Sequence, residues 1–204
     1  MSEKEAKNGE KEVLFGLTKG RGLGTMKEEK HRRRGRKKAM EKSKTCCFTG
    51  HRPNKLPWGE NENAPECLAL KASIARKVEE AYLRGYRHFI CGMAQGADFY
   101  FCEAVQALRD TYPGVTVEAA IPCESQANRW SRADRERYER LVGLCDFETM
   151  VQHHYDRGCM LRRNRYMVDR SSLLIAAFDG SKGGTLYTIT YAMKKGIEVE
   201  IIDV

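Results

Sequence analysis

The amino-acid sequence predicts an α/β fold in three layers, with a mostly parallel β-sheet between helices. Short apolar segments typical of strands alternate with longer segments of helical periodicity along the chain. One of the apolar segments, Val115–Ile121, is almost continuously apolar, as expected of a parallel strand that is covered on both faces. Strict alternation of strands and helices favours parallel pairing. The 204 residues, 41% of them hydrophobic, have room for one such domain with a packed core.

Six strands are predicted from apolar runs that are bounded by turn residues. They are Thr45–Phe48, His88–Cys91, Val115–Ile121, Phe147–Val151, Leu173–Phe178 and Glu198–Ile202. Three helices follow from apolar residues at helical spacing. They are Glu66–Leu83, Ala97–Leu108 and Cys159–Ser171. A further helix is expected between the glycine-rich turn at residues 179–185 and Gly196, which follows two lysines as a C-cap.

Ser125 is predicted to cap one more helix, with Ala127, Trp130, Tyr138 and Leu141 on its inner face. Seven charged side chains occupy the other side of this helix, which we interpret as a face in solvent. They are Arg129, Arg132, Arg135, Glu136, Arg137, Glu139 and Arg140.

The net charge of +8 is confined to the N-terminal segment. Residues 1–45 contain 15 Lys or Arg and 7 Asp or Glu, whereas residues 46–204 contain 21 of each. Residues 1–44 are polar and lack apolar periodicity, so we predict a disordered basic tail before a domain at 45–204. Its run His31–Lys38 could contact nucleic acid. Alternatively, translation starts downstream, for example at Met40.

The cysteine pattern and the lack of targeting segments predict a cytoplasmic protein. The eight cysteines include no C-x-x-C pair, and several lie in apolar runs, which is typical of buried thiols in a reducing compartment. No apolar run approaches the roughly 20 residues that span a bilayer, and the N-terminus has no apolar signal segment. The pair His153-His154 lacks partners at metal-ligand spacing, so no metal site is predicted.

The segment His88–Val105, which reads HFICGMAQGADFYFCEAV, predicts a strand, a glycine-rich turn and the start of a helix. Such a turn leaves the first N–H groups of the helix free to hold an anion. Gly92 and Gly96 allow a close approach of the backbone, and Asp98 lies in the first helical turn, where a carboxylate suits the helix dipole. Taken alone, the segment fits an anion site and a tight connection equally well.

Two further turns are expected at the same edge of the sheet. Gly50-His51-Arg52 follows the first strand, and Gly183-Gly184-Thr185 follows the fifth. Ligands of parallel α/β sheets bind beyond the carboxyl ends of the strands. Three polar or glycine-rich turns on one edge therefore favour an anion-binding crevice over three tight connections.

Four motifs together resemble the YpsA-like proteins of the SLOG superfamily, which have Rossmann-like domains. They are TGHRPNKL at Thr49–Leu56, GMAQGAD at Gly92–Asp98, RRNRYMVDRS at Arg162–Ser171 and KGGT at Lys182–Thr185. The resemblance covers residues 45–204. It implies a single Rossmann-like domain that binds a nucleotide or a nucleotide-derived ligand, with a sensor or regulatory role in bacterial stress or cell division.

Two groups of relatives imply alternative functions. The Lonely Guy phosphoribohydrolases carry an arginine that Arg163 resembles and a P-G-G-x-G-T-x-x-E motif that Gly184-Thr185 resembles. Here Thr188 stands in place of the glutamate, which favours binding over cleavage of an N-glycosidic bond, although Asp98 or Glu124 could substitute. DNA-processing protein A, which binds single-stranded DNA, has turns that resemble Gly92–Asp98 and an R-N-R motif. The neutral charge of residues 46–204 disfavours a long nucleic-acid track.

The predicted partner is a nucleotide-derived small molecule, with nucleic acid less favoured and no membrane contact. Phosphate oxygens are expected at the backbone of the two glycine turns and at the fork of Arg163. Asn164 either contacts the ligand or satisfies a buried backbone group. No catalytic residue, cofactor or oligomeric state is predicted. The candidate ligand-binding residues are Gly50, His51, Arg52, Gly92, Gln95, Gly96, Asp98, Arg163, Asn164, Gly183, Gly184 and Thr185.

Overall fold

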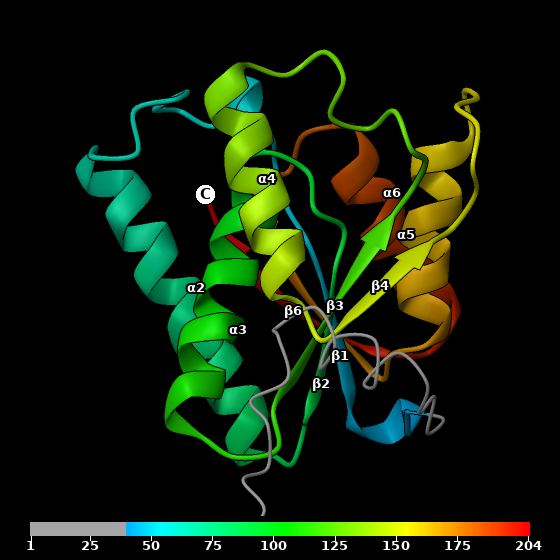
Figure 1. The fold of residues 1–204 in the computed structure, drawn as a ribbon. Coiled ribbons are helices and arrows are strands. Elements are labelled where there is room, and N and C mark those ends of the chain that lie inside the picture. Colours follow the sequence, from blue (N-terminus) through cyan, green and yellow to red (C-terminus); the bar gives the residue numbers. More distant parts are fainter. Residues whose placement is uncertain (1–39) are drawn as a thin grey trace, which may run out of the picture.

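The fold is built on one sheet of six parallel strands. A computed structural model describes residues 40–204. The strands lie in the order β4-β3-β2-β1-β5-β6, and each neighbouring pair is parallel (Figure 1). Their bounds are β1 Thr45–Thr49, β2 His88–Cys91, β3 Thr116–Ile121, β4 Phe147–Met150, β5 Leu173–Phe178 and β6 Glu198–Asp203.

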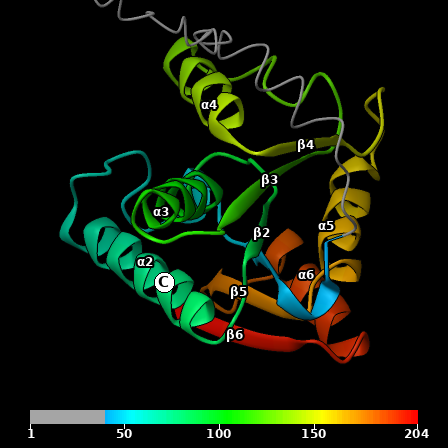
Figure 2. The same cartoon turned by 60° about the horizontal axis from the view of Figure 1, so that its bottom comes forward.

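Helices cover both faces of the sheet, so the fold has three layers. Figure 2 shows α2, α3 and α4 on one face and α5 and α6 on the other. The helices are α2 Pro65–Leu83, α3 Ala97–Thr111, α4 Arg132–Leu144, α5 Cys159–Asp169 and α6 Gly184–Lys194. Two short 3₁₀ turns, η1 Lys42–Lys44 and η2 Pro53–Lys55, lie before and after β1. The predicted Rossmann-like α/β fold is confirmed.

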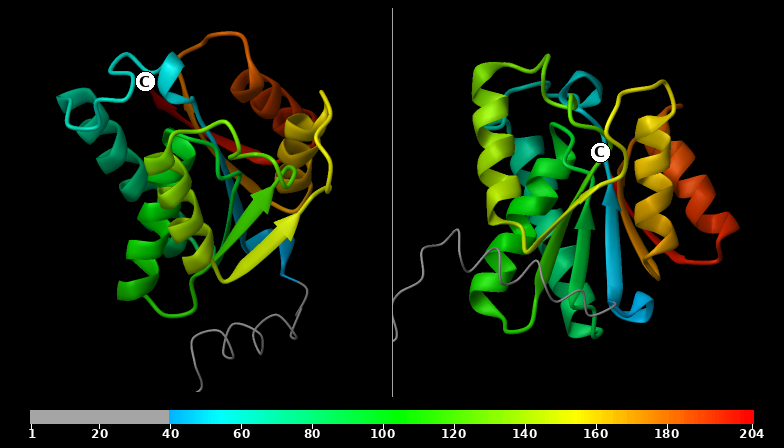
Figure 3. Two further views of the ribbon diagram at one scale, coloured as in Figure 1. Left: turned by 45° about the horizontal axis from the view of Figure 1, so that its top comes forward. Right: turned by 45° about the vertical axis from the view of Figure 1, so that its right-hand side comes forward.

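The strand order reverses beside β1. The chain runs outward from β1 to β4, then returns so that β5 pairs with the free side of β1 and β6 follows it (Figure 3). Loops that leave β1 and β5 at their carboxyl ends therefore turn toward opposite faces of the sheet. This reversal opens a crevice where parallel α/β sheets bind ligands.

Each face of the sheet packs its own apolar layer. Toward α2, α3 and α4, the buried rings of Phe48 and Phe101 stack with centroids 4.6 Å apart. Toward α5 and α6, buried residues such as Met167 and Leu174 form a second cluster. All eight cysteines are buried free thiols, as predicted. None of the helices within residues 40–204 has the length and apolarity that crossing a membrane requires.

Regular structure is present just before the predicted start of the domain. Of the tail predicted at residues 1–44, residues 1–39 lie outside the described part of the chain. Within residues 40–44, Lys42–Lys44 form η1, and the Thr45 hydroxyl donates to the carbonyl of Glu41 at 2.9 Å. Regular structure is therefore present three residues before the predicted start of the domain.

The prediction that Ser125 caps the helix before β4 is wrong. The helix begins at Arg132, and its cap is Ser131, whose hydroxyl accepts a hydrogen bond from the N–H of Asp134 at 3.1 Å. Residues 122–131 instead form a loop, in which Trp130 packs edge-on against Phe99 with ring centroids 5.9 Å apart. Ser131 with its matching Asp134 is a stronger capping pattern than Ser125, because the Asp134 carboxylate also accepts from the Ser131 hydroxyl at 2.6 Å.

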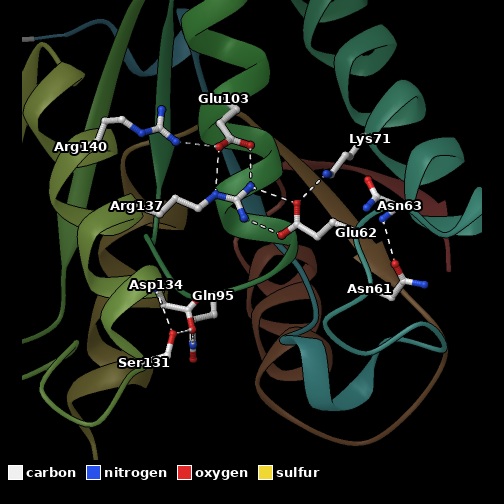
Figure 4. Close-up of polar contacts among 10 residues, drawn as sticks. All are labelled: Asn61, Glu62, Asn63, Lys71, Gln95, Glu103, Ser131, Asp134, Arg137 and Arg140. Carbon is white, nitrogen blue, oxygen red and sulfur yellow. Dashed lines mark hydrogen bonds and ion pairs between the residues drawn. The ribbon is translucent and has the colours of Figure 1, made fainter.

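The prediction that Arg137 faces solvent is also wrong. Its side chain is 22% exposed and lies between two carboxylates, as Figure 4 shows. The guanidinium donates to Glu62 at 2.5 Å and to Glu103 at 2.8 Å, and Glu62 also pairs with Lys71 at 2.6 Å. These partners come from α2, α3 and the loop before α2, which the periodicity of a single helix does not reveal.

Candidate functional site

A cavity of about 300 Å³ lies at the carboxyl ends of β1 and β5, where the strand order reverses. The loop after β1, the first turns of α3 and α6, and one side of α5 surround it. Residues far apart in the sequence meet here because parallel strands carry their carboxyl ends to one edge.

The loop after β1 is tied to the loop after β5 at the rim of this cavity. The buried His51 places Nε2 2.7 Å from a carboxylate oxygen of Asp179. Hydrogen bonds from the hydroxyl and the N–H of Ser181, reinforced by His51, lower the pKa of Asp179 to about 2. The carboxylate is therefore ionised at neutral pH and holds the two loops together.

Lys55, at the end of η2, makes a second connection between the same loops. Its ammonium donates to the carbonyl of Lys182 at 2.7 Å and to the hydroxyl of Ser181 at 3.3 Å. Lys55 also lines the cavity. The rigid ring of Pro53 at the start of η2 fixes the turn that carries this side chain across the cavity mouth.

The first turn of α6 is open to the cavity. Its N-cap is Gly183, which has no side chain to accept from the first N–H groups of the helix. A Cβ added to Gly184 would meet no atom within 4 Å, so space lies in front of this turn. The Thr185 hydroxyl donates to the carbonyl of Gly50 at 3.1 Å, which joins α6 to the loop after β1.

The turn between β2 and α3 is closed by groups of the protein itself. The N–H of Ala94 donates to the Asp98 carboxylate at 3.1 Å, and the N–H of Ala97 donates to the carbonyl of His51 at 3.1 Å. Gly96 has a φ of 81°, and a Cβ at this position would lie 2.8 Å from the His51 carbonyl. A Cβ at Gly92 would overlap the Arg163 guanidinium. These glycines are required by packing inside the turn.

Arg163 lies beneath the cavity with its guanidinium buried. It donates to the carbonyl of Gly92 and to the side-chain oxygen of Asn164, the latter at 2.8 Å. The Asp98 carboxylate is 3.7 Å away. Burial lowers the pKa of Arg163 despite Asp98, and burial raises the pKa of Asp98 despite Arg163. The cost of burying both charges thus outweighs their attraction.

Asn164 continues this buried network toward α6. Its amide donates to the hydroxyl of Thr188 at 2.8 Å, and Thr188 in turn donates to the carbonyl of Gly184 at 2.8 Å. Thr188 is fully buried. A hydroxyl in this place links two helices and supplies no carboxylate.

Most of the predicted site residues meet at the cavity. Eight of them line it, namely Gly50, His51, Arg52, Asp98, Arg163, Asn164, Gly184 and Thr185. Gly92, Gly96 and Gly183 support the surrounding turns, whereas the Gln95 amide bonds to Asp134 at 2.9 Å. The lining residues that the sequence reasoning missed are Thr49, Asn54, Lys55, Ala94, Met160 and Met167. The first four lie inside the TGHRPNKL and GMAQGAD motifs, which were the available signal.

No metal centre is evident in residues 40–204, where no group of three His, Cys, Asp or Glu side chains is arranged to hold an ion. His153 is exposed and pairs with Glu124 at 2.9 Å in a loop.

Relatives from two bacilli are similar to this chain over most of their length. The SPbeta prophage-derived protein YoqJ of Bacillus subtilis strain 168 is 29% identical over 143 residues, which cover 64% of this chain and 84% of the relative. A UPF0398 protein of Bacillus pumilus strain SAFR-032 is 24% identical over 144 residues, which cover 70% of this chain and 77% of the relative.

Two solved structures share the fold. DNA processing protein A of Streptococcus pneumoniae matches with a TM-score of 0.54 and 16% identity, over 78% of this chain and 50% of that one. DNA processing protein A of Helicobacter pylori, whose structure concerns single-stranded DNA binding, matches with a TM-score of 0.53 and 15% identity, over 77% of this chain and 64% of that one. The chain thus spans less than two thirds of either protein.

The family assignment rests on a match over nearly the whole described domain. The family model YpsA, described as the YspA SLOG family, matches residues 46–203. This range contains all six strands apart from the first residue of β1, and all of the cavity. The chain therefore belongs to the YpsA family of SLOG proteins.

Proposed function

We propose that this chain binds a nucleotide or a nucleotide-derived small molecule in the cavity between the ends of β1 and β5. The observation that carries the proposal is the cavity itself, which combines cationic side chains with an open helix start at the strand-order reversal. Arg52, Lys55 and the first turn of α6 border it. Cations and free N–H groups in one place favour a phosphate group.

The remaining wall of the cavity suits a nucleoside. Met160 and Met167 line it from α5. Thioether side chains are apolar and adaptable, so they fit the face of a base. A volume of about 300 Å³ is at the lower end of small-molecule sites, which range from about 300 to 1,000 Å³. This size favours a single nucleotide unit over a long strand.

A sensor or regulatory module accounts for these features better than a hydrolase. Of the residues that line the cavity, Asp98 is the one carboxylate, and one of its oxygens already accepts from Ala94. Thr188 cannot stabilise the positive charge that develops when an N-glycosidic bond breaks. Release of free base from nucleoside monophosphates, above the level of a heat-inactivated control, would contradict this view.

Single-stranded nucleic acid is a second candidate, favoured by the fold shared with DNA processing protein A. One arginine and two aromatic side chains lie together on α5 and α6, where the exposed Arg165 lies over the rings of Tyr187 and Tyr191 at 5.5 and 5.7 Å. Such combinations suit phosphates and stacked bases. Binding here would weaken steeply with salt and would require several nucleotides.

Calorimetric titration of the full chain tests the proposal directly. Adenosine, guanosine, cytidine and uridine monophosphates are titrated separately, together with a short thymidine oligonucleotide. At least one monophosphate should bind with a dissociation constant below about 1 mM, that is, with more than about 4 kcal/mol of binding free energy. Binding of the oligonucleotide alone would favour the second candidate.

The variant Gly184→Val tests whether the start of α6 contributes to binding. The new side chain would occupy the open space before α6, so we expect monophosphate binding to fall at least about tenfold. Gly143→Val is the control, because a Cβ there also meets no atom within 4 Å but lies on α4. Both variants should unfold at nearly the wild-type temperature. Equal affinities for the two variants would remove α6 from the site.

A further inference from the structure

Lys55 carries a positive charge that no carboxylate in the described part of the chain compensates. Its ammonium contacts two neutral acceptors, the carbonyl of Lys182 and the hydroxyl of Ser181. The nearby carboxylate of Asp179 is engaged by His51 and by the N–H of Ser181 instead. Among residues 40–204, this lysine takes part in no ion pair, although its side chain reaches over more than 120 residues of sequence to the opposite loop.

The position of the ammonium places this charge at the start of α6. A Cβ added to Gly183 would lie 2.9 Å from Nζ of Lys55, so the nitrogen rests against the residue before the helix. Lys55 and Gly184 line the same cavity. By contrast, Arg163, which also lines the cavity, donates from Nε to Asn164 and from Nη1 to the carbonyl of Gly92.

We propose that Lys55 is an exchangeable strap for the phosphate of the ligand, bonded to the loop after β5 in the empty protein and to a phosphate oxygen in the complex. This inference rests on the nucleotide-binding function proposed above. A phosphate oxygen adds the Coulomb attraction between opposite charges to the hydrogen bond, so an arriving phosphate displaces a carbonyl or hydroxyl acceptor. The flexible lysine stem allows the exchange without moving η2.

The proposed role of Lys55 predicts a dependence on the phosphate of the ligand. Lys55 should contribute to affinity only when the ligand carries a phosphate, and should leave the nucleoside unaffected. A lysine that merely holds the loop in shape would contribute equally to both ligands. Comparison of a nucleotide with its nucleoside therefore separates the two roles.

The experiment titrates adenosine monophosphate and adenosine into full-length wild type, Lys55→Gln, Lys55→Arg and Lys182→Gln. Lys55→Gln should weaken the monophosphate about 10- to 100-fold, the range for a hydrogen bond to a charged group, and leave adenosine within about twofold. Lys55→Arg, which keeps the charge, should recover most of the affinity. Lys182→Gln removes the same charge from the adjacent loop outside the cavity lining and should stay within about twofold.

Three results would overturn the inference, and they differ from one another. Equal weakening of nucleotide and nucleoside in Lys55→Gln would assign the lysine to loop structure. Unchanged nucleotide affinity in Lys55→Gln, while wild type binds, would exclude Lys55 and leave the proposed function intact. If the wild type bound neither adenosine monophosphate nor the other nucleotides nor inorganic phosphate, both proposals would fall. Urea unfolding of each variant confirms that the titrated protein is folded.

Discussion

Arg137 on α4 and Arg163 on α5 are both at least partly buried, but their hydrogen-bond partners differ in charge. Arg137 lies partly exposed between the carboxylates of Glu62 and Glu103. Arg163 is buried, donates mainly to neutral oxygens of Gly92 and Asn164, and has its one carboxylate, Asp98, 3.7 Å away.

The electrostatic consequences of the two settings are opposite. Burial lowers the pKa of Arg137, but the hydrogen bonds that its guanidinium donates to Glu103 and Glu62 outweigh this and raise the pKa above its usual value. Burial lowers the pKa of Arg163, and Asp98 does not restore it. Two charged partners at hydrogen-bond distance therefore compensate for desolvation, whereas one distant partner does not.

The two networks also join different parts of the molecule. The Arg137 network holds the loop before α2 against α3 and α4 (Figure 4), and these helices lie on the opposite face of the sheet from α5 (Figure 2). The Arg163 network holds the β2–α3 turn against α5 directly beneath the cavity. Arg163 also lines the cavity, so this network supports the turn and the cavity wall together.

The largest expected effect comes from Arg163→Ala. Loss of the guanidinium leaves the Gly92 carbonyl and the Asp98 carboxylate buried without their partner, and breaking a buried pair in this way costs about 3–5 kcal/mol of unfolding free energy. Urea unfolding followed by circular dichroism measures this cost. Arg165→Ala, two residues along α5 and exposed, is the control and should cost no more than about 1 kcal/mol.

The contrast between the two arginines would be wrong if Arg163→Ala had the unfolding free energy of the wild type and bound a nucleotide more weakly. Arg163 would then be a ligand contact, as the sequence predicted, and its present hydrogen bonds would be exchangeable.

A smaller effect is expected from Arg137→Ala, about 1.5–3 kcal/mol for hydrogen bonds to charged groups. Glu62 and Glu103 remain partly hydrated when the arginine is lost, which limits the cost. Raising salt from about 0.1 M to about 1 M should reduce the effect of Arg137→Ala but leave that of Arg163→Ala unchanged, since buried charges are screened less. If Arg137→Ala changed the unfolding free energy by less than about 0.5 kcal/mol, Arg137 would behave like an ordinary surface residue.

The smallest effects concern acid pH, where the two networks should respond with opposite sign. Burial raises the pKa of Glu62, but hydrogen bonds from Arg137 and Lys71 outweigh it and hold the pKa below its usual value. The stability contributed by Glu62 is thus fully present above its unfolded pKa of about 4.3 and is lost as pH falls through the folded value. The wild type should lose its advantage over Glu62→Gln on acidification.

For Asp98 the sign reverses, because burial raises its pKa. Its contribution is fully present below the unfolded pKa of about 3.9 and is lost as pH rises through the folded value. The wild type should therefore gain stability relative to Asp98→Asn as pH falls. Urea unfolding free energies of both variants between about pH 3 and pH 7 provide the measurement, and parallel curves for the two variants would contradict the sign difference.

The sequence by itself determined the elements of this protein. Strand β2, His88–Cys91, and strand β5, Leu173–Phe178, have the predicted bounds, because short apolar runs between turn residues depend on local conformational preference and burial. Family motifs also indicated most of the residues around the cavity, since glycines in tight turns and polar residues at strand ends are local features.

Only the tertiary structure decided which hydrogen-bond partners these residues have. Arg137 was predicted to face solvent, yet its partners include Glu62, 75 residues away. Arg163, predicted to hold a ligand, lines the cavity and also donates to Gly92, 71 residues away. Lys55 likewise reaches Lys182 across 127 residues. Hydrogen-bond partners and burial depend on which strands become neighbours, and the strand order β4-β3-β2-β1-β5-β6 is set by packing of the whole sheet, which no local pattern encodes.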